Sequence, residues 1–138
     1  MKSAETNTFD RENQMEKLES KELVGIIVRA LEEKKAENIE VIEIDQISPL
    51  ADFFVIANGS NANQTEAMVD EVQEKAAMAG FQADHVEGHK NANWTLIDFK
   101  GVVVHIFDQE GREFYDLARI WQDGTKLDPK SLAELKAE

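Results

Sequence analysis

Residues 94–121 read WTLIDFKGVVVHIFDQEGREFYDLARIW, and this stretch decides the fold. Alternating and β-branched residues over 94–99 and 102–107, separated by Lys100-Gly101, predict two antiparallel strands joined by a tight turn. A helix is predicted to follow over residues 109–121. The stretch contains both tryptophans and the only tyrosine of the chain. It is therefore the first place to look for function.

Periodicity predicts four elements upstream of this hairpin. Residues 21–35 place apolar side chains on one face of a helix, and residues 39–45 are β-branched and partly alternating, which is typical of a strand. Residues 53–57 form a continuous apolar run, as in a strand buried on both faces. A second long helix is predicted to begin near Asn63, which has Glu66 three residues further on, the spacing of an N-terminal cap.

The order of predicted elements is helix, strand, strand, helix, three strands and helix, with a weaker strand over residues 81–87. This order predicts a single α/β domain: a mixed β-sheet of about five strands with helices packed on it. The domain is expected to span residues 20–123. Residues 1–19 are polar and of mixed charge, so a flexible N-terminal extension is expected. Residues 124–138 are expected to form a C-terminal tail, in which Asp128-Pro129 favours a short helix.

Composition narrows the classes of partner. The chain has 15 basic and 28 acidic residues and a net charge of −13, without a cluster of Lys and Arg that could bind a phosphate backbone. Direct nucleic-acid binding is therefore disfavoured, whereas a basic protein partner would be attracted. The absence of cysteine excludes disulfides and thiolate chemistry. No signal sequence or membrane-spanning run is evident, so we expect a cytoplasmic protein without a membrane partner.

One pattern suggests an enzyme. Gly59-Ser60 lies between a predicted buried strand and a helix, where backbone N–H groups can bind phosphate. Nucleotidyltransferases combine such a Gly-Ser pair with closely spaced carboxylates that hold magnesium ions. Here the nearest carboxylate pair, Glu43 and Asp45, precedes Gly59-Ser60 instead of following it. We favour a simple strand-to-helix turn, and keep a magnesium-dependent nucleotide-binding or nucleotidyltransferase-like enzyme as the alternative.

The three histidines give little support for a metal site. His85 and His89 would share a face only in a helix, but their segment is predicted as strand and loop. A metal ion would need further ligands, such as Glu87 or His105. His105 is more simply a partly buried or exposed-face residue of the hairpin. We therefore predict neither metal nor cofactor.

The hairpin itself can bind a protein partner. Trp94 and Asp98 share one face of the first strand, and His105 lies on the second. Trp, Tyr and Arg dominate binding hot spots, which makes a docking face a competitor to a purely structural core. We expect the core to contain Phe99, Val104, Ile106 and Leu117, and the outward-facing side chains to be Trp94, His105 and Tyr115.

The chain also resembles a known family, the ribosomal silencing factor or Iojap-like family, over residues 20–123. The resemblance is carried by the ordered series Ile42-Glu43-Ile44-Asp45, Ala51-Asp52-Phe53-Phe54-Val55-Ile56, Gly59-Ser60, Glu87-Gly88, Trp94, Asp98, Val104-His105, Arg112, Tyr115-Asp116-Leu117 and Trp121. Two positions depart from the family pattern. Asn63 stands beside Gln64 where the family often has Arg, and Ala118 stands where Glu is usual.

The resemblance implies a non-enzymatic factor with a fold similar to that of nucleotidyltransferases but without their activity. Such a factor docks on the large ribosomal subunit through ribosomal protein number fourteen of that subunit. It blocks association with the small subunit and represses translation when nutrients are scarce. Family members tend to be homodimers. Carried over to this chain, the partner-binding residues would be Trp94, Asp98, His105, Arg112, Tyr115, Asp116 and Trp121.

Overall fold

The computed structural model describes the backbone of residues 2–88 and 93–134, and the side chains of residues 15–88 and 93–134. His89 therefore lies outside the described residues. The strands are β1 (Glu37–Glu43), β2 (Phe53–Asn58), β3 (His85–Glu87), β4 (Trp94–Asp98), β5 (Val102–Phe107) and β6 (Thr125–Leu127). The helices are α1 (Lys2–Glu33), α2 (Ala62–Met78), α3 (Gln109–Tyr115), α4 (Leu117–Ile120) and α5 (Pro129–Glu134).

The strands form one mixed sheet in the order β3-β4-β5-β2-β1-β6. The predicted hairpin is confirmed, because β4 and β5 pair antiparallel with Trp94 opposite Phe107. The predicted count of about five strands was too low. β6 is the additional strand, and it pairs antiparallel with β1 inside the segment predicted as a tail. The parallel partner of β2 is β5. After α2 the chain first forms the edge strand β3, and then passes through β4 to reach β5 beside β2.

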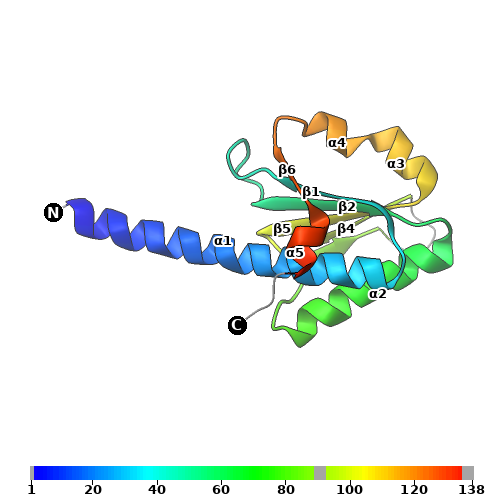
Figure 1. Ribbon diagram of the computed structural model, residues 1–138, viewed down its shortest axis with the longest axis horizontal. Helices are drawn as coiled ribbons and strands as arrows, with labels where there is room; N and C mark the ends of the chain where they lie inside the picture. The colour runs from blue at the N-terminus through cyan, green and yellow to red at the C-terminus, as the bar shows by residue number, and fades with distance from the viewer. Residues whose placement is uncertain (1, 89–92, 135–138) are drawn as a thin grey trace.

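One face of the sheet is covered by α1, α2 and α5 (Figure 1). The core on this face consists of every second strand residue, including Val55 of β2 and Val104 of β5, packed against Ile27 and Leu31 of α1. α5 lies directly on α1, and a Cβ on Gly25 would lie 2.6 Å from the carbonyl oxygen of Leu132. Glycine at this position therefore allows the close contact of the two helices.

The other face is covered by α3 and α4 alone (Figure 1). Neighbouring residues of a strand point to opposite faces, so the strand residues buried here are those between the ones that face the first core. The buried side chains of this second core are Ile42, Ile44, Ala51, Phe54, Ile56, Val103, Phe107 and Leu117. Asp108 caps α3 by accepting a hydrogen bond from Gly111 N at 2.7 Å. Because α3 and α4 are only seven and four residues long, side chains of the sheet such as Trp94 and Leu96 remain partly accessible on this second face.

Several element boundaries differ from the predictions: β3 is confined to His85–Glu87 instead of 81–87, and β1 covers Glu37–Glu43 instead of 39–45. α1 begins at Lys2, so the predicted helix of residues 21–35 is its C-terminal half. Asn61, not Asn63, caps α2, because its side chain accepts from Gln64 N at 2.9 Å. The predicted helix over 109–121 is broken at Asp116, whose φ of 39° is left-handed. None of the helices in the described ranges combines the length and apolar character that crossing a bilayer requires.

Candidate protein-binding face

Aromatic side chains gather on the second face of the sheet. Trp94 is their centre: its ring lies 4.6 Å from Tyr115 and 5.3 Å from Phe107, measured between ring centroids. Trp121 packs edge-on against Phe54 at 5.0 Å. We name this group the aromatic face and define it as Phe54, Trp94, His105, Phe107, Tyr115 and Trp121. Aromatic pairs at these separations add stability beyond the area they bury.

Strand register and the break after α3 together assemble this face. Trp94 and Phe107 are direct partners in the β4–β5 ladder, so their side chains project from the same side. The left-handed conformation of Asp116 ends α3 and lets α4 start in a new direction. Leu117 is thereby buried against the sheet, and Trp121 reaches Phe54. A continuous helix would not place Tyr115 and Trp121 on the same surface in this way.

His105 is buried, with 4% of its surface exposed, and the prediction that it faces outward was wrong. Its Nδ1 accepts a hydrogen bond from Nε1 of Trp94 at 3.1 Å, and the ring of Phe54 lies edge-on at 4.7 Å. Because Nδ1 is the acceptor, Nε2 carries the proton, and Nε2 has no hydrogen-bond partner among the described residues. Burial lowers the pKa of His105 to about 4. The imidazole is therefore neutral at physiological pH.

The other predictions about the hairpin are confirmed in part. Val104 and Ile106 are buried, and so is Leu117. Phe99 is partly buried and packs against the first core. Trp94 and Tyr115, predicted to face outward, are partly buried and pack against the second core. The structure thus divides the aromatic face into a buried layer and an accessible layer above it.

Arg112 is held within the chain. Its Nη2 lies 2.6 Å from Glu40 Oε2, and its Nη1 donates to Asn58 Oδ1 at 3.2 Å. Asn58 is itself buried and donates to Glu37. Lys126 of β6 adds a longer ion pair to Glu40 at 3.6 Å. These contacts tie α3 to β1 and β2, and so Arg112 positions the helix that carries Tyr115.

The remaining predicted site residues lie around the aromatic face. Asp98 is on the same side of β4 as Trp94, but at the other end of the strand. Its partner in the β4–β5 ladder is Val103. Asp116 is exposed at the junction of α3 and α4. Both carboxylates are therefore placed at the rim of the face, and the aromatic rings form its centre.

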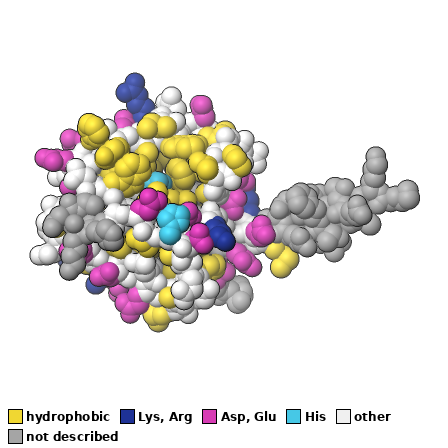
Figure 2. Space-filling model, turned by 180° about the vertical axis from the view of Figure 1, so that it is seen from behind, with side chains coloured by type: hydrophobic (Ala, Val, Ile, Leu, Met, Phe, Trp, Pro, Cys, Tyr) yellow, Lys and Arg dark blue, Asp and Glu magenta, His cyan; other side chains and the backbone are white. Residues whose placement is uncertain are grey.

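Two exposed apolar residues on the covering helices were not selected from the sequence. Phe114 is 80% exposed and packs edge-on against Tyr115 at 4.9 Å between ring centroids. Ile120 of α4 is also exposed. Figure 2 shows a broad hydrophobic patch on this side of the molecule, bordered by histidine and acidic side chains. The position of Phe114 and Ile120, each beside an aromatic residue that was selected, is a signal that could have identified them.

The residues of the enzyme alternative do not form a site. Glu43 pairs with Phe53 at one end of β2, and Gly59 follows the other end, so roughly 17 Å of extended strand separates them. Lys17 of α1 lies 2.5 Å from Glu43 and 2.9 Å from Asp45. These contacts raise the pKa of Lys17 to about 12, with the hydrogen bond to Glu43 as the largest cause. The carboxylate pair therefore stabilises the attachment of α1 to the sheet.

The turn at Gly59-Ser60 is filled by a side chain. Gln64 Oε1 accepts from Ser60 N at 2.7 Å and from Ser60 Oγ at 3.0 Å. Its Nε2 donates to the carbonyl groups of Lys34 and Lys35. The backbone N–H that would bind a phosphate is already satisfied, so the turn joins α2 to the end of α1.

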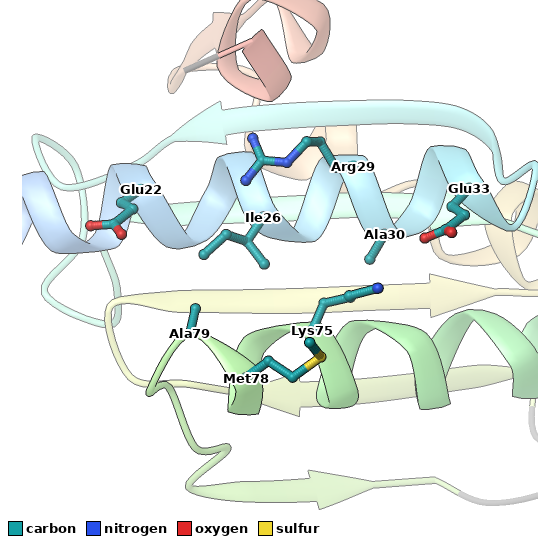
Figure 3. A pocket seen from close by; sticks show the side chains of 8 residues that line it. All are labelled: Glu22, Ile26, Arg29, Ala30, Glu33, Lys75, Met78 and Ala79. Atoms are coloured by element: carbon teal, nitrogen blue, oxygen red, sulfur yellow. The ribbon is translucent and has the colours of Figure 1, made fainter. Parts of the chain in front are cut away.

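A groove of about 440 Å³ lies between α1 and α2, on the opposite side of the sheet (Figure 3). Figure 3 shows the side chains that line it, which are Glu22, Ile26, Arg29, Ala30, Glu33, Lys75, Met78 and Ala79. The groove contains neither the Gly59-Ser60 turn nor the Glu43–Asp45 pair. It therefore adds no support for nucleotide binding.

Solved structures contain the same fold. The crystal structure of a Chromobacterium violaceum protein superposes with a TM-score of 0.71 and 30% sequence identity, covering 78% of this chain and 88% of that one. A Bacillus halodurans protein superposes with a TM-score of 0.69 and 34% identity, covering 78% and 97% of the two chains. Both structures therefore share the fold over 78% of this chain.

Sequence relatives agree. The family model described as "Ribosomal silencing factor during starvation" matches residues 17–138. The ribosomal silencing factor of Halalkalibacterium halodurans is 34% identical over 111 residues, which cover 80% of this chain and 95% of the relative. The "Mitochondrial assembly of ribosomal large subunit protein 1" of Mus musculus is 28% identical over 101 residues, covering 71% and 44%. With a family match over nearly the whole chain and a shared fold, this chain belongs to the ribosomal silencing factor family.

Proposed function

We propose that the aromatic face docks on the large ribosomal subunit, with the ribosomal protein number fourteen of that subunit as its partner. Bound there, the factor would block association with the small subunit and repress translation under nutrient limitation. The observation that carries the proposal is the layer of accessible rings over a buried layer, with Phe114 80% exposed beside Tyr115. Large rings held rigidly at a surface bury much area on binding at a low entropic cost.

Charge supports a basic partner. The chain has a net charge of −13, and the carboxylates of Asp98 and Asp116 lie at the rim of the aromatic face. Rim charges of this kind mainly steer encounter and depend on salt, whereas the central rings provide affinity. Ribosomal proteins are a class in which a basic surface meets these requirements.

The residues divide between contact and support. Trp94, Tyr115 and Trp121 would contact the partner through their accessible edges, and Phe114, which packs against Tyr115 at the border of the aromatic face, would contact it as well. Asp98 and Asp116 would act as rim charges. His105 and Arg112 would act from within the chain, His105 by holding the indole of Trp94 and Arg112 by holding α3.

The same proposal includes a cytoplasmic, non-enzymatic homodimer. The fold would be similar to that of nucleotidyltransferases, which also have a Gly-Ser turn after a strand. In this chain that turn is filled by Gln64, and Glu43 and Asp45 both form ion pairs with Lys17. Catalysis is therefore not part of the proposed function.

Sedimentation with purified subunits tests this directly. The full chain is incubated with either large or small ribosomal subunits and centrifuged through sucrose at increasing salt. We expect sedimentation with the large subunit only, weakening as salt rises, and reduced formation of joined ribosomes when the factor is in excess. Equal sedimentation with both subunits, or unimpaired joining at saturating factor, would refute the proposal.

A further inference from the structure

A cluster of three side chains lies beside the rim of the aromatic face, formed by Asp84 just before β3, His85 of β3 and Asp98 of β4. His85 lies opposite Asp98 in the β3–β4 ladder, and Asp84 immediately precedes His85. Nδ1 of His85 lies 3.7 Å from Asp84 Oδ2 and 3.8 Å from Asp98 Oδ2. One ligand atom from each of the three residues lies within 4.8 Å of the others. The two distances from the imidazole nitrogen exceed those of hydrogen bonds, so the three atoms surround a gap instead of bonding to one another.

The other polar atom of each side chain is occupied elsewhere. His85 Nε2 donates to Glu87 Oε2 at 3.2 Å, and Asp98 Oδ1 accepts from Lys100 N at 2.7 Å. Asp84 Oδ1 faces Lys100 Nζ at 3.8 Å. In the neutral imidazole with its proton on Nε2, Nδ1 has a lone pair on the side of the two aspartates, and binding of a metal ion requires this form. Each residue thus presents its remaining ligand atom to the same gap.

We propose that Asp84, His85 and Asp98 form a site for a divalent transition metal of the zinc class. Metal–ligand bonds of the usual lengths in tetrahedral geometry separate ligand atoms by about 3.3 Å, so a small inward movement of exposed side chains completes the site. Imidazole nitrogen favours zinc over magnesium or calcium, which prefer oxygen ligands. Metal-binding histidines usually donate their other ring N–H to a carboxylate that orients the ring. Glu87 would do this for His85 by accepting from its Nε2.

This site differs from the metal ligands considered from the sequence. Glu87 holds His85 from outside, and His105 is buried with Nδ1 bonded to Trp94. The two other ligands of the proposed site are Asp84, the residue before His85, and Asp98 of the neighbouring strand β4. The site shares Asp98 with the rim of the aromatic face, but zinc binding is measured without ribosomal subunits, so the two proposals can fail separately.

Titration of the full chain with zinc chloride in a non-chelating buffer, followed by calorimetry, tests the proposal. We expect saturable binding of one ion per chain, weakened at least about tenfold by His85→Gln or Asp98→Asn. Glu87→Gln should weaken binding less, since an amide oxygen can still accept from Nε2. Lys100→Ala should tighten binding, because it removes the ammonium group beside Asp84. Circular dichroism establishes that each variant is folded.

Two controls make the result specific. Asp70→Asn on α2 and Asp123→Asn each remove an exposed carboxylate outside the cluster. Neither should change the affinity for zinc. Loss of binding in Asp70→Asn or Asp123→Asn would overturn the site, as would unchanged binding in both His85→Gln and Asp98→Asn. The absence of a saturable signal with the unmodified chain, or equal affinity for magnesium chloride, would also overturn it.

Discussion

Nε1 of Trp94 donates a hydrogen bond to Nδ1 of His105 at 3.1 Å, across the neighbouring strands β4 and β5. The bond joins the accessible layer of the aromatic face to its buried layer. It fixes the orientation of the indole and the tautomer of the imidazole together. Both residues were selected from the sequence as outward-facing, and the structure shows instead that the second supports the first.

Acidification should destabilise the protein through His105. Its pKa is lowered from 6.5 to about 4 in the folded state by burial, so the unfolded chain binds the proton more tightly. The stabilising contribution is therefore complete above pH 6.5 and is lost as pH falls toward 4. Linkage limits the loss to roughly 3 kcal/mol. Urea unfolding across this range measures it.

The matched variant for this experiment is His105→Gln, which cannot titrate there. Carboxylates also titrate across the range, so the informative quantity is the difference between the two proteins. The unmodified chain should lose more stability than the variant on acidification. Parallel pH profiles would show that His105 does not couple to folding.

Replacing Trp94 with Phe should cost about 1 kcal/mol of stability beyond the area lost, because the donor to His105 disappears. The variant keeps an aromatic ring against Phe107 and Tyr115. A double-mutant cycle with His105→Gln isolates the pairwise term. If the two substitutions are additive in denaturant unfolding, the hydrogen bond contributes nothing measurable.

Arg112→Lys should destabilise the fold by about 1–3 kcal/mol, although the charge is retained. A lysine cannot donate to both Glu40 and Asn58 in the geometry that the guanidinium uses. Arg119→Lys on α4 is the control, since Arg119 is exposed. Thermal or urea unfolding compares the two. Equal stability of both variants would mean that the buried network around Asn58 does not need the arginine.

Lys17→Met should cost about 1 kcal/mol, a value reduced by the partial exposure of the lysine. The loss leaves Glu43 and Asp45 close together without their shared cation. Lys21→Met, at an exposed position on the same helix, is the matched control. Unfolding in urea should separate the two variants. Were Lys21→Met as damaging as Lys17→Met, a general effect of helix charge would explain both.

Local patterns predicted the parts of the fold that depend on near neighbours. The hairpin around Lys100-Gly101 and the helical character of residues 21–33 and of α2 follow from periodicity and turn chemistry. Long-range pairing did not follow, because β2 finds its parallel partner β5 more than forty residues further along the chain. β6 was missed because three residues, Thr125–Leu127, are too few for a detectable pattern.

The candidate site likewise has features that local sequence predicts and features that depend on long-range contacts. The concentration of rings in residues 94–121 was visible in the sequence, as was the sharing of one face by Trp94 and Asp98. The burial of His105 depends on the indole that covers it, and the role of Arg112 depends on Glu40, which is 72 residues away. The convergence of Asp84, His85 and Asp98 likewise depends on the register of β3 against β4. These relationships exist only in the folded sheet.

The central claim is that the aromatic face contacts the large ribosomal subunit. Phe114→Ala and Met78→Ala are a matched pair, since the two side chains are 80% and 73% exposed but lie on helices that cover opposite faces of the sheet. The decisive measurement is the dissociation constant of each folded variant for purified large subunits. Truncation of a hot-spot ring typically costs about 1–2 kcal/mol or more, so Phe114→Ala should bind roughly tenfold more weakly while Met78→Ala binds as the unmodified chain does. Equal affinities for the two variants, or a loss confined to Met78→Ala, would contradict the claim.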